Sequence, residues 1–313
     1  MMKTVLTLLF PTLLSGQMRG PMVDRLVLAM GTELRLHLQG EGALAGAEAA
    51  LAECARIEAE CSTWNPDSSW SQLNAAKGRP VRLGEEWLSL LGQVKAWNLC
   101  TEGAFDPVLM ALLQAWDLRG PGRMPTPEEL AGALNASGAG LLELDAEAGT
   151  ARLTDPKAGL EEGGFLKGYA LDRMRKRTNV REGWLNFGGQ IVAWGRPRPV
   201  SIANPQHRDQ PRVRLELQNA SLSSSGTSER GRHILDPRSG DRCAAWGATA
   251  VVATEALTAD VLSTALYVMG PDAGLVWAER HEVAAAFLLK DGCVRMTRAF
   301  RTFHPTLVSL EAR

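Results

Sequence analysis

The chain has 313 residues, of which 45% are hydrophobic and 22% charged, an ordinary globular composition with enough apolar material for one large core or two joined subdomains. Its formal net charge of −1 argues against a nucleic-acid-binding protein, because affinity for a phosphate backbone needs clustered Lys and Arg side chains. The five cysteines form no CxxC pair, so neither a zinc site nor a disulfide framework is indicated.

The N-terminus has the pattern of an export signal. A short basic segment, Met1-Met2-Lys3, precedes an apolar run that ends near Leu14 and is too short to span a bilayer. We expect a signal peptide over residues 1–17 and an exported protein, in the periplasm or facing it at the inner membrane. Two alternatives are a mature apolar strand and a true start at Met18 or Met22, which would remove the signal.

Hydrophobic spacing predicts the elements of the first half of the chain. Residues 23–39 alternate and indicate a strand pair or one bent strand, whereas residues 43–60 and 85–100 have helical spacing. Thr126, Pro127 and Glu129 predict a helix start with a capping box. Residues 141–154 then indicate a hairpin.

The second half mixes strands and helices without strict alternation. We expect helices over residues 165–178 and 258–269, and short strands over 184–194, 200–203, 213–217 and 249–252. A final strand pair is expected over 283–289 and 294–300. Gly188-Gly189 interrupts one strand, which usually marks a bulge or a close backbone approach. This order favours an α+β fold over a doubly wound sheet.

Asp260 and Thr264 are the first candidate metal ligands. They are four residues apart on a predicted helix and so share one face, with Asp260 expected in the first turn. A carboxylate and a hydroxyl are oxygen ligands of the kind that Mg²⁺ prefers. On spacing alone, a capping Asp260 and a Thr264 bonded back to the helix are the more common structures.

Other candidate groups lie in glycine-rich and polar segments. Gly163, Gly164 and Lys167 precede a helix and could approach a phosphate, although a plain turn with a surface lysine explains them equally well. His233 is a potential acid or base, or a structural histidine. Asp106 before a proline could cap a helix, and Trp64 could stack on a planar ligand.

Taken in order, these segments resemble the FAD:protein FMN transferases, the ApbE family. The matching blocks run in the right order from about residue 23 to about residue 270: Ala29-Met30-Gly31-Thr32, 61–74, 103–107, 167–172, 186–189, 203–205, 224–226, 233–240 and 258–264. The resemblance implies a single α+β domain of T-fold-like architecture over residues 23–313, with FAD bound in a cleft.

The resemblance also implies roles for particular residues. Asp260, Thr264 and a backbone carbonyl near Gly164 would bind Mg²⁺. The positions that would contact FAD are Met30, Trp64, Ala104, Phe105, Asp106, Glu161, Lys167, His233 and Ile234. Lys167 would add positive charge, and His233 or Asp260 would take the proton of the attacking hydroxyl.

The implied reaction is transfer of FMN from FAD to a threonine of another protein, with release of AMP. The acceptor would be a membrane-associated electron-transfer subunit. A FAD pyrophosphatase and an exported FAD carrier stay open as alternatives. The chain departs from the family pattern at four positions, Gln190, Glu161, Trp64 and Ser224. The changes at Trp64 and Ser224 are conservative, whereas those at Gln190 and Glu161 affect the fine positioning of site groups and not the metal pair.

Overall fold

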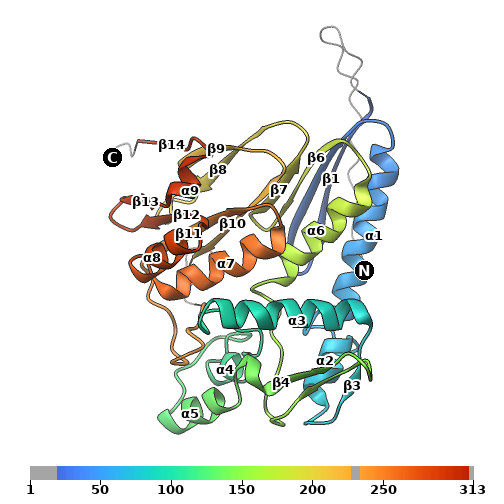
Figure 1. Ribbon diagram of the computed structural model, residues 1–313, viewed down its shortest axis with the longest axis vertical. Helices are drawn as coiled ribbons and strands as arrows, with labels where there is room; N and C mark the ends of the chain where they lie inside the picture. The colour runs from blue at the N-terminus through green and yellow to red at the C-terminus, as the bar shows by residue number, and fades with distance from the viewer. Residues whose placement is uncertain (1–19, 227–232, 310–313) are drawn as a thin grey trace.

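The centre of the molecule is an eight-stranded sheet. The structure is a computed structural model that describes residues 20–226 and 233–309 (Figure 1), so the predicted leader lies outside the described residues. The strand order is β1-β2-β6-β7-β10-β11-β12-β13, and every neighbouring pair is antiparallel. The strands are β1 (Met22–Ala29), β2 (Thr32–Gln39), β6 (Glu182–Phe187), β7 (Gln190–Trp194), β10 (Ala220–Gly226), β11 (Gly247–Ala253), β12 (Ala284–Leu289) and β13 (Val294–Met296). Antiparallel strands with packed helices confirm the predicted α+β class.

Four helices cover one face of this sheet, as Figure 1 shows. They are α1 (Ala43–Cys61), α6 (Leu166–Thr178), α7 (Ala256–Met269) and α8 (Ala273–Arg280). The predictions for α1, α6 and α7 are confirmed, although α7 begins two residues earlier than expected. Leu34 and Leu36 of β2 join Ala47 of α1 in the main core, where Cys54 and Cys61 are also buried. The alternation of β2 therefore directs its leucines to the helices.

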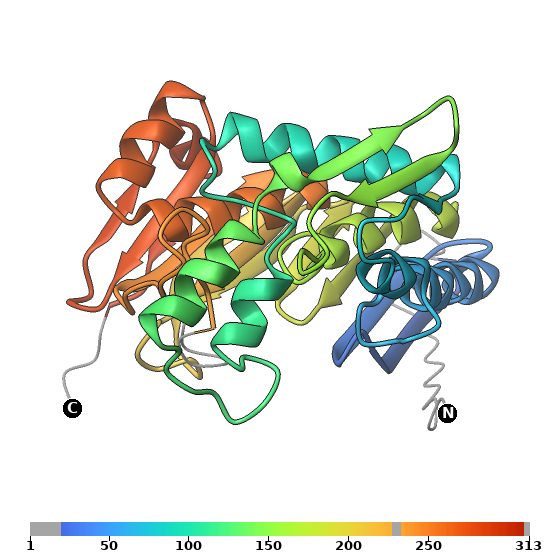
Figure 2. The same ribbon diagram turned by 90° about the horizontal axis from the view of Figure 1, so that it is seen from below.

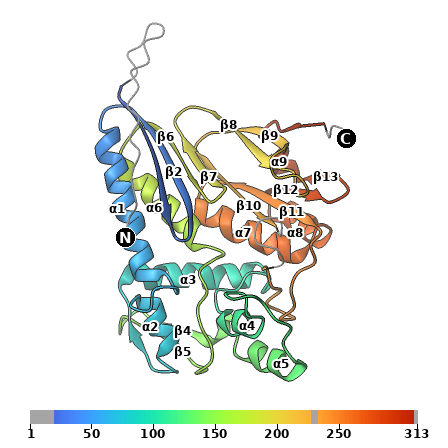
Figure 3. The same cartoon turned by 180° about the vertical axis from the view of Figure 1, so that it is seen from behind.

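A smaller sheet covers part of the opposite face (Figure 3). Its order is β14-β9-β8, with β8 (Arg198–Ala203), β9 (Pro211–Leu217) and β14 (Thr306–Leu307), and Leu215 packs in one cluster with Leu222 of β10. The final predicted strand, 294–300, is too long: β13 ends at Met296, and α9 (Arg298–Arg301) follows. The reason is that the Thr297 hydroxyl accepts a hydrogen bond from Phe300 N at 3.2 Å and starts the helix.

The remaining elements form a layer below the helices, seen from below in Figure 2. The confirmed hairpin β4 (Leu142–Asp145) and β5 (Thr150–Leu153) joins β3 (Val81–Arg82) in a three-stranded sheet. The helices of this layer are α2 (Ser69–Ala75), α3 (Glu85–Cys100), α4 (Met110–Ala115), α5 (Pro127–Asn135) and the 3-10 turn η1 (Ala139–Leu141). The predicted capping box at Thr126 and Glu129 is present at the start of α5.

Two tight turns meet at one end of the large sheet. Met30 and Gly31 connect β1 to β2 with φ of 44° and 72°, and Gly188 and Gly189 connect β6 to β7 with φ of 57° and 92°. Gly188 N donates to Glu33 O at 2.9 Å, which brings the turns together. The glycine pair forms a hairpin turn, since both positions need the left-handed backbone that glycine adopts freely. Of the two expected features, the bulge is absent here, and a close backbone approach to something bound stays a prediction.

Some elements were not predicted: β10, α2, α4 and α8. No helix in the described parts of the chain has the length and apolar character needed to cross a bilayer.

Candidate functional site

The predicted metal ligands lie at the junction of α6 and α7. Asp260 is 6% exposed, and its Oδ2 accepts a hydrogen bond from Gly168 N of α6 at 2.9 Å. Because α7 begins at Ala256, Asp260 lies in the second helical turn and not in the first, which corrects the expectation. Its position is set by the neighbouring helix and not by the dipole at the end of its own helix.

Hydroxyl groups from β10 and α7 surround this carboxylate. Ser223 Oγ donates to Asp260 Oδ1 at 3.5 Å, the outer limit of a hydrogen bond, and lies 3.2 Å from Ser263 Oγ. Ser225 Oγ lies 2.9 Å from Ser263 Oγ and 3.3 Å from Thr264 Oγ1. These serines link Asp260 to Thr264 through short contacts. The sequence singled out Ser224, whose side chain is exposed, because the strand alternation of β10 was not recognised.

Gly164 and Lys167 join the same group. A Cβ at Gly164 would lie 3.7 Å from Thr264 Oγ1, so the backbone of the glycine-rich loop runs past the threonine. Lys167 Nζ donates to Gly163 O at 3.1 Å, and its charge acts on Asp260. The structure thus brings together all three predicted metal ligands and the predicted cation.

The donor set fits a hard cation. Burial raises the pKa of Asp260, while the charge of Lys167, the Gly168 N–H and the Ser223 hydroxyl oppose this effect. A buried carboxylate gains most when a cation neutralises it. Among the described residues no group of three or more His, Cys, Asp or Glu side chains could hold a metal. The predicted ligands are instead one carboxylate, one hydroxyl and one backbone carbonyl, oxygen ligands of the kind that suits Mg²⁺.

Trp64, predicted to stack on a planar ligand, lies on the surface beside Arg119. Its side chain is 66% exposed, and the Arg119 guanidinium lies 4.3 Å from the ring centroid. Arg119 is held in turn by Thr63, through the carbonyl at 3.1 Å and the hydroxyl at 2.5 Å, and by Glu162, 3.8 Å away. The sequence analysis missed Arg119, and no local pattern around it could have revealed the contact.

Two neighbouring glutamates, Glu161 and Glu162, connect the Trp64 segment to the glycine-rich loop. Glu162 accepts a hydrogen bond from Thr63 N at 2.9 Å, and Glu161 Oε2 accepts one from Gly163 N at 3.0 Å. Burial and the negative charge of Glu162 raise the pKa of Glu161. Glu161, which replaces the usual aspartate, therefore lies in the loop that carries Gly164.

Ala104, Phe105 and Asp106 are buried within the protein. The Phe105 ring lies next to Gly164, 3.4 Å from the position of an added Cβ. Asp106 accepts hydrogen bonds from Val108 N at 2.7 Å, Ala139 N at 2.9 Å and the Asn98 amide at 2.8 Å. Burial raises the pKa of Asp106 to about 6. Its carboxylate joins three chain segments beneath the site, so contact with FAD stays a prediction.

The other predicted FAD contacts lie on separate segments. Met30 occupies the β1–β2 turn, where its N–H donates to Glu58 Oε1 at 2.8 Å. His233 and Ile234 directly follow residues 227–232, which lie outside the described residues, and Ile234 O accepts from Cys243 N at 2.9 Å. The segment that begins with His233 and Ile234 also contains Arg238. A Cβ added at Gly103, next to Ala104, would lie 3.6 Å from Arg238 Cγ, so this segment packs beside the predicted FAD-contacting residues 104–106.

Gln190, another of the four departures from the expected family pattern, contacts the start of α7. Its side chain is 3% exposed, and Nε2 donates to Ala256 O at 2.7 Å at the start of the helix. Its Oε1 is buried without a hydrogen-bond partner in the described structure. Gln190 therefore ties the β6–β7 turn to the helix that carries Asp260 and Thr264.

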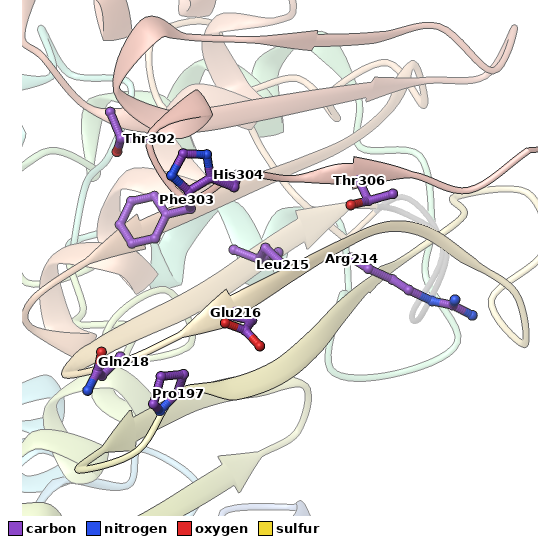
Figure 4. A pocket seen from close by; sticks show the side chains of 9 residues that line it. All are labelled: Pro197, Arg214, Leu215, Glu216, Gln218, Thr302, Phe303, His304 and Thr306. Atoms are coloured by element: carbon purple, nitrogen blue, oxygen red, sulfur yellow. The ribbon is translucent and has the colours of Figure 1, made fainter.

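A surface groove of about 560 Å³ lies elsewhere, between β9, β14 and the end of α9 (Figure 4). It is lined by Pro197, Arg214, Leu215, Glu216, Gln218, Thr302, Phe303, His304 and Thr306. None of the predicted site residues is among them. The groove also lacks a buried carboxylate and a glycine-rich loop, the two features of the candidate site at Asp260.

Comparisons with known proteins agree with the fold and with the family resemblance. A model of the ApbE family matches residues 30–288. The FAD:protein FMN transferase of Haemophilus influenzae is 26% identical over 79% of each chain, and one from Klebsiella pneumoniae is 27% identical over 88% of this chain and 87% of the relative. The apo crystal structure of the flavinyl transferase ApbE of Pseudomonas stutzeri superposes with a TM-score of 0.83 at 25% identity, covering 92% of this chain and 99% of that one. The ApbE protein of Thermotoga maritima gives 0.84 at 26% identity over 90% and 99%.

Proposed function

The chain belongs to the ApbE family, and from that membership we propose that it transfers the FMN part of FAD to another protein. The observation that carries the proposal is the group formed by Asp260, Thr264 and Gly164 at the junction of α6 and α7. Relatives from Haemophilus, Chlamydia, Klebsiella and Vibrio bear the name FAD:protein FMN transferase, and that shared name supports the same activity here.

We propose that the reaction is a phosphoryl transfer that depends on Mg²⁺. Asp260, Thr264 and the Gly164 carbonyl would hold the ion, which when bound supplies positive charge at the pyrophosphate oxygens. Lys167 supplies a second positive charge beside Asp260. Trp64, backed by Arg119, offers an aromatic surface for a planar ring of FAD.

The proposed reaction forms one phosphorus–oxygen bond and breaks another. The hydroxyl oxygen of an acceptor threonine attacks the phosphorus of the FMN half, and the bond from that phosphorus to the AMP oxygen breaks. AMP leaves, and the flavin becomes linked through a phosphoester. His233 is the proposed acceptor of the threonine proton, since imidazole titrates near neutral pH. If water attacks instead, the products are FMN and AMP.

The deciding experiment is mass spectrometry of an acceptor after reaction. The full-length protein is incubated with FAD, Mg²⁺ and an electron-transfer subunit that carries the acceptor threonine. We expect an added FMN mass and release of AMP. An Asp260→Asn variant, which keeps an oxygen for Gly168 N, should lose both products, and the exposed Asp291→Asn variant should keep them.

Other outcomes would contradict the proposal in distinct ways. Release of AMP and free FMN with no labelled acceptor would identify a FAD pyrophosphatase. Bound but intact FAD would identify a carrier. Unchanged activity of Asp260→Asn, or activity without any divalent cation, would remove the metal role.

We also propose that the protein is exported and works on a membrane-associated acceptor. The basic and apolar pattern of residues 1–17 supports this placement. Fractionation of cells, with sequencing of the mature N-terminus, should find a shortened chain outside the cytoplasm. A full-length chain in the cytoplasmic fraction would contradict the proposal.

A further inference from the structure

A second cluster of polar groups lies on the face of the large sheet opposite α6 and α7. Trp184 of β6 stacks with His37 of β2, with ring centroids 5.7 Å apart and an angle of 14° between the planes. The guanidinium of Arg198, at the start of β8, lies 3.8 Å from the Trp184 ring centroid. A small cavity of about 90 Å³ opens beside them, lined by His37, Glu182, Gly183, Trp184, Trp194, Arg196, Pro197, Arg198 and Pro199.

The indole N–H of Trp184 is buried without a hydrogen-bond acceptor. The residue is 9% exposed, and Nε1 has no partner among the described residues. Trp194, which lines the same cavity, satisfies its own N–H by donating to Val180 O at 3.0 Å. A buried donor with no acceptor is costly in a folded protein, so the Trp184 N–H requires an acceptor from outside the described residues.

The positive charge of Arg198 also lacks a close counter-ion. No ion pair or side-chain hydrogen bond of Arg198 occurs within the described parts of the chain, and burial together with the nearby Arg35 lowers its pKa, against the attraction of Asp24. The two neighbouring carboxylates are already engaged. Asp24 lies 3.0 Å from His37 Nδ1 and 3.8 Å from Arg35, and Glu182 pairs with Arg196 at 3.1 Å. Arg35 and Arg196 therefore take up the two nearby carboxylates, and neither carboxylate pairs with Arg198.

We propose that this cavity binds a small oxyanion, held by the Arg198 guanidinium and the Trp184 N–H. A guanidinium presents a planar fork of donors that matches a carboxylate or a phosphate, and the indole N–H adds one directed donor. A water molecule would satisfy the N–H but would leave the charge of Arg198 unbalanced. The site is separate from Asp260, which lies on the helix-covered face, and the proposal does not depend on the transferase activity.

The test follows the indole N–H resonance of Trp184 by NMR in the ¹⁵N-labelled full-length protein. The resonance is assigned by its absence from a Trp184→Phe variant, which keeps an aromatic ring but removes the donor. Sodium acetate and inorganic phosphate are titrated separately at pH 7 against sodium chloride at the same ionic strength. We expect the resonance to shift in a saturable way with one or both oxyanions and not with chloride, and the two titrations distinguish carboxylate from phosphate.

Affinity measured by calorimetry should fall in matched variants. Trp184→Phe should weaken oxyanion binding by about tenfold, because it removes one hydrogen bond to a charged group. Arg198→Lys keeps the charge but loses the fork, and a similar loss is expected. Arg152→Gln, an exposed arginine paired with Glu143 elsewhere on the surface, should bind as the wild type does.

Three results would overturn the proposal. The first is an indole resonance that does not move with either oxyanion. The second is an equal shift with chloride, which would show only a salt effect. The third is equal affinity in the wild type and Arg198→Lys, since the guanidinium would then take no part. A folded Arg198→Lys protein, checked by its unfolding midpoint, keeps this comparison valid.

Discussion

Gly168 is a point of close contact between α6 and α7, and its replacement tests how the candidate site is held. A Cβ at this position would lie 2.4 Å from Ala256 O and 2.8 Å from the Asp260 Cβ. Neither neighbour is the end of a flexible side chain, so α6 must move away from α7. Gly168→Ala should therefore destabilise the protein and displace the N–H that donates to Asp260 at 2.9 Å.

Two opposing effects set the change in the free energy of unfolding that Gly168→Ala should cause. Overpacking of a tight contact costs about 1–3 kcal/mol, whereas alanine is favoured over glycine within a helix by about 1 kcal/mol. We expect a net loss of up to about 2 kcal/mol in the free energy of unfolding. Mg²⁺ affinity should fall as well, because the Asp260 carboxylate loses its fixed partner.

The assay is urea unfolding of the full-length protein, with Mg²⁺ binding measured by calorimetry. Gly132→Ala is the matched control, because this glycine lies within α5 and an added Cβ would meet no atom within 4 Å. It should stabilise the protein by up to about 1 kcal/mol. If Gly168→Ala is as stable as Gly132→Ala and binds Mg²⁺ normally, the close contact does not hold the site.

Three further predictions concern single side chains. Because burial raises the pKa of Asp106 to about 6, the folded state binds more protons than the unfolded chain above about pH 4, and this residue's contribution to stability falls as the pH rises from about 4 to 6. Urea titrations at pH 4.5 and 7 should show a smaller loss of unfolding free energy between these two pH values in Asp106→Asn than in the wild type, by up to roughly 2 kcal/mol; identical pH dependence would contradict this. Thr126→Ala removes the hydrogen bond from Glu129 N to the capping hydroxyl and should lower the free energy of unfolding by about 1 kcal/mol. Thr126→Ser keeps a hydroxyl and should keep most of the stability; an unchanged melting temperature in Thr126→Ala would count against the cap. Arg119→Met should weaken FAD binding by about three- to tenfold in a flavin-fluorescence titration, because Trp64 loses the cation that fixes its ring; equal affinity would separate Arg119 from flavin binding.

Local patterns were sufficient for the elements with strong signals. The helix of residues 43–60, the capping box at Thr126 and the alternation of residues 23–39 were all predicted correctly, because these signals act within a few neighbouring residues. The spacing of Asp260 and Thr264 likewise placed both side chains on one face of a helix. The order of the motifs along the chain then indicated the family.

Other elements depended on their neighbours in space. The serine-rich segment of β10 lacks the branched and aromatic residues typical of strands, and it is a strand because β7 and β11 pair with it on both sides. The same pairing turns Ser223 and Ser225 toward α7. Gly188-Gly189 became a hairpin turn because the strands on either side pair with each other.

The sequence by itself determined the family and the main helices, and it supplied the candidate site residues. The tertiary structure decided which groups surround them: Gly168 N on Asp260, Arg119 against Trp64, and Arg198 against Trp184. Periodicity reports only the direction of a side chain relative to its own helix or strand. The partner that it meets comes from a distant segment, and packing and burial choose that partner once the whole chain has folded.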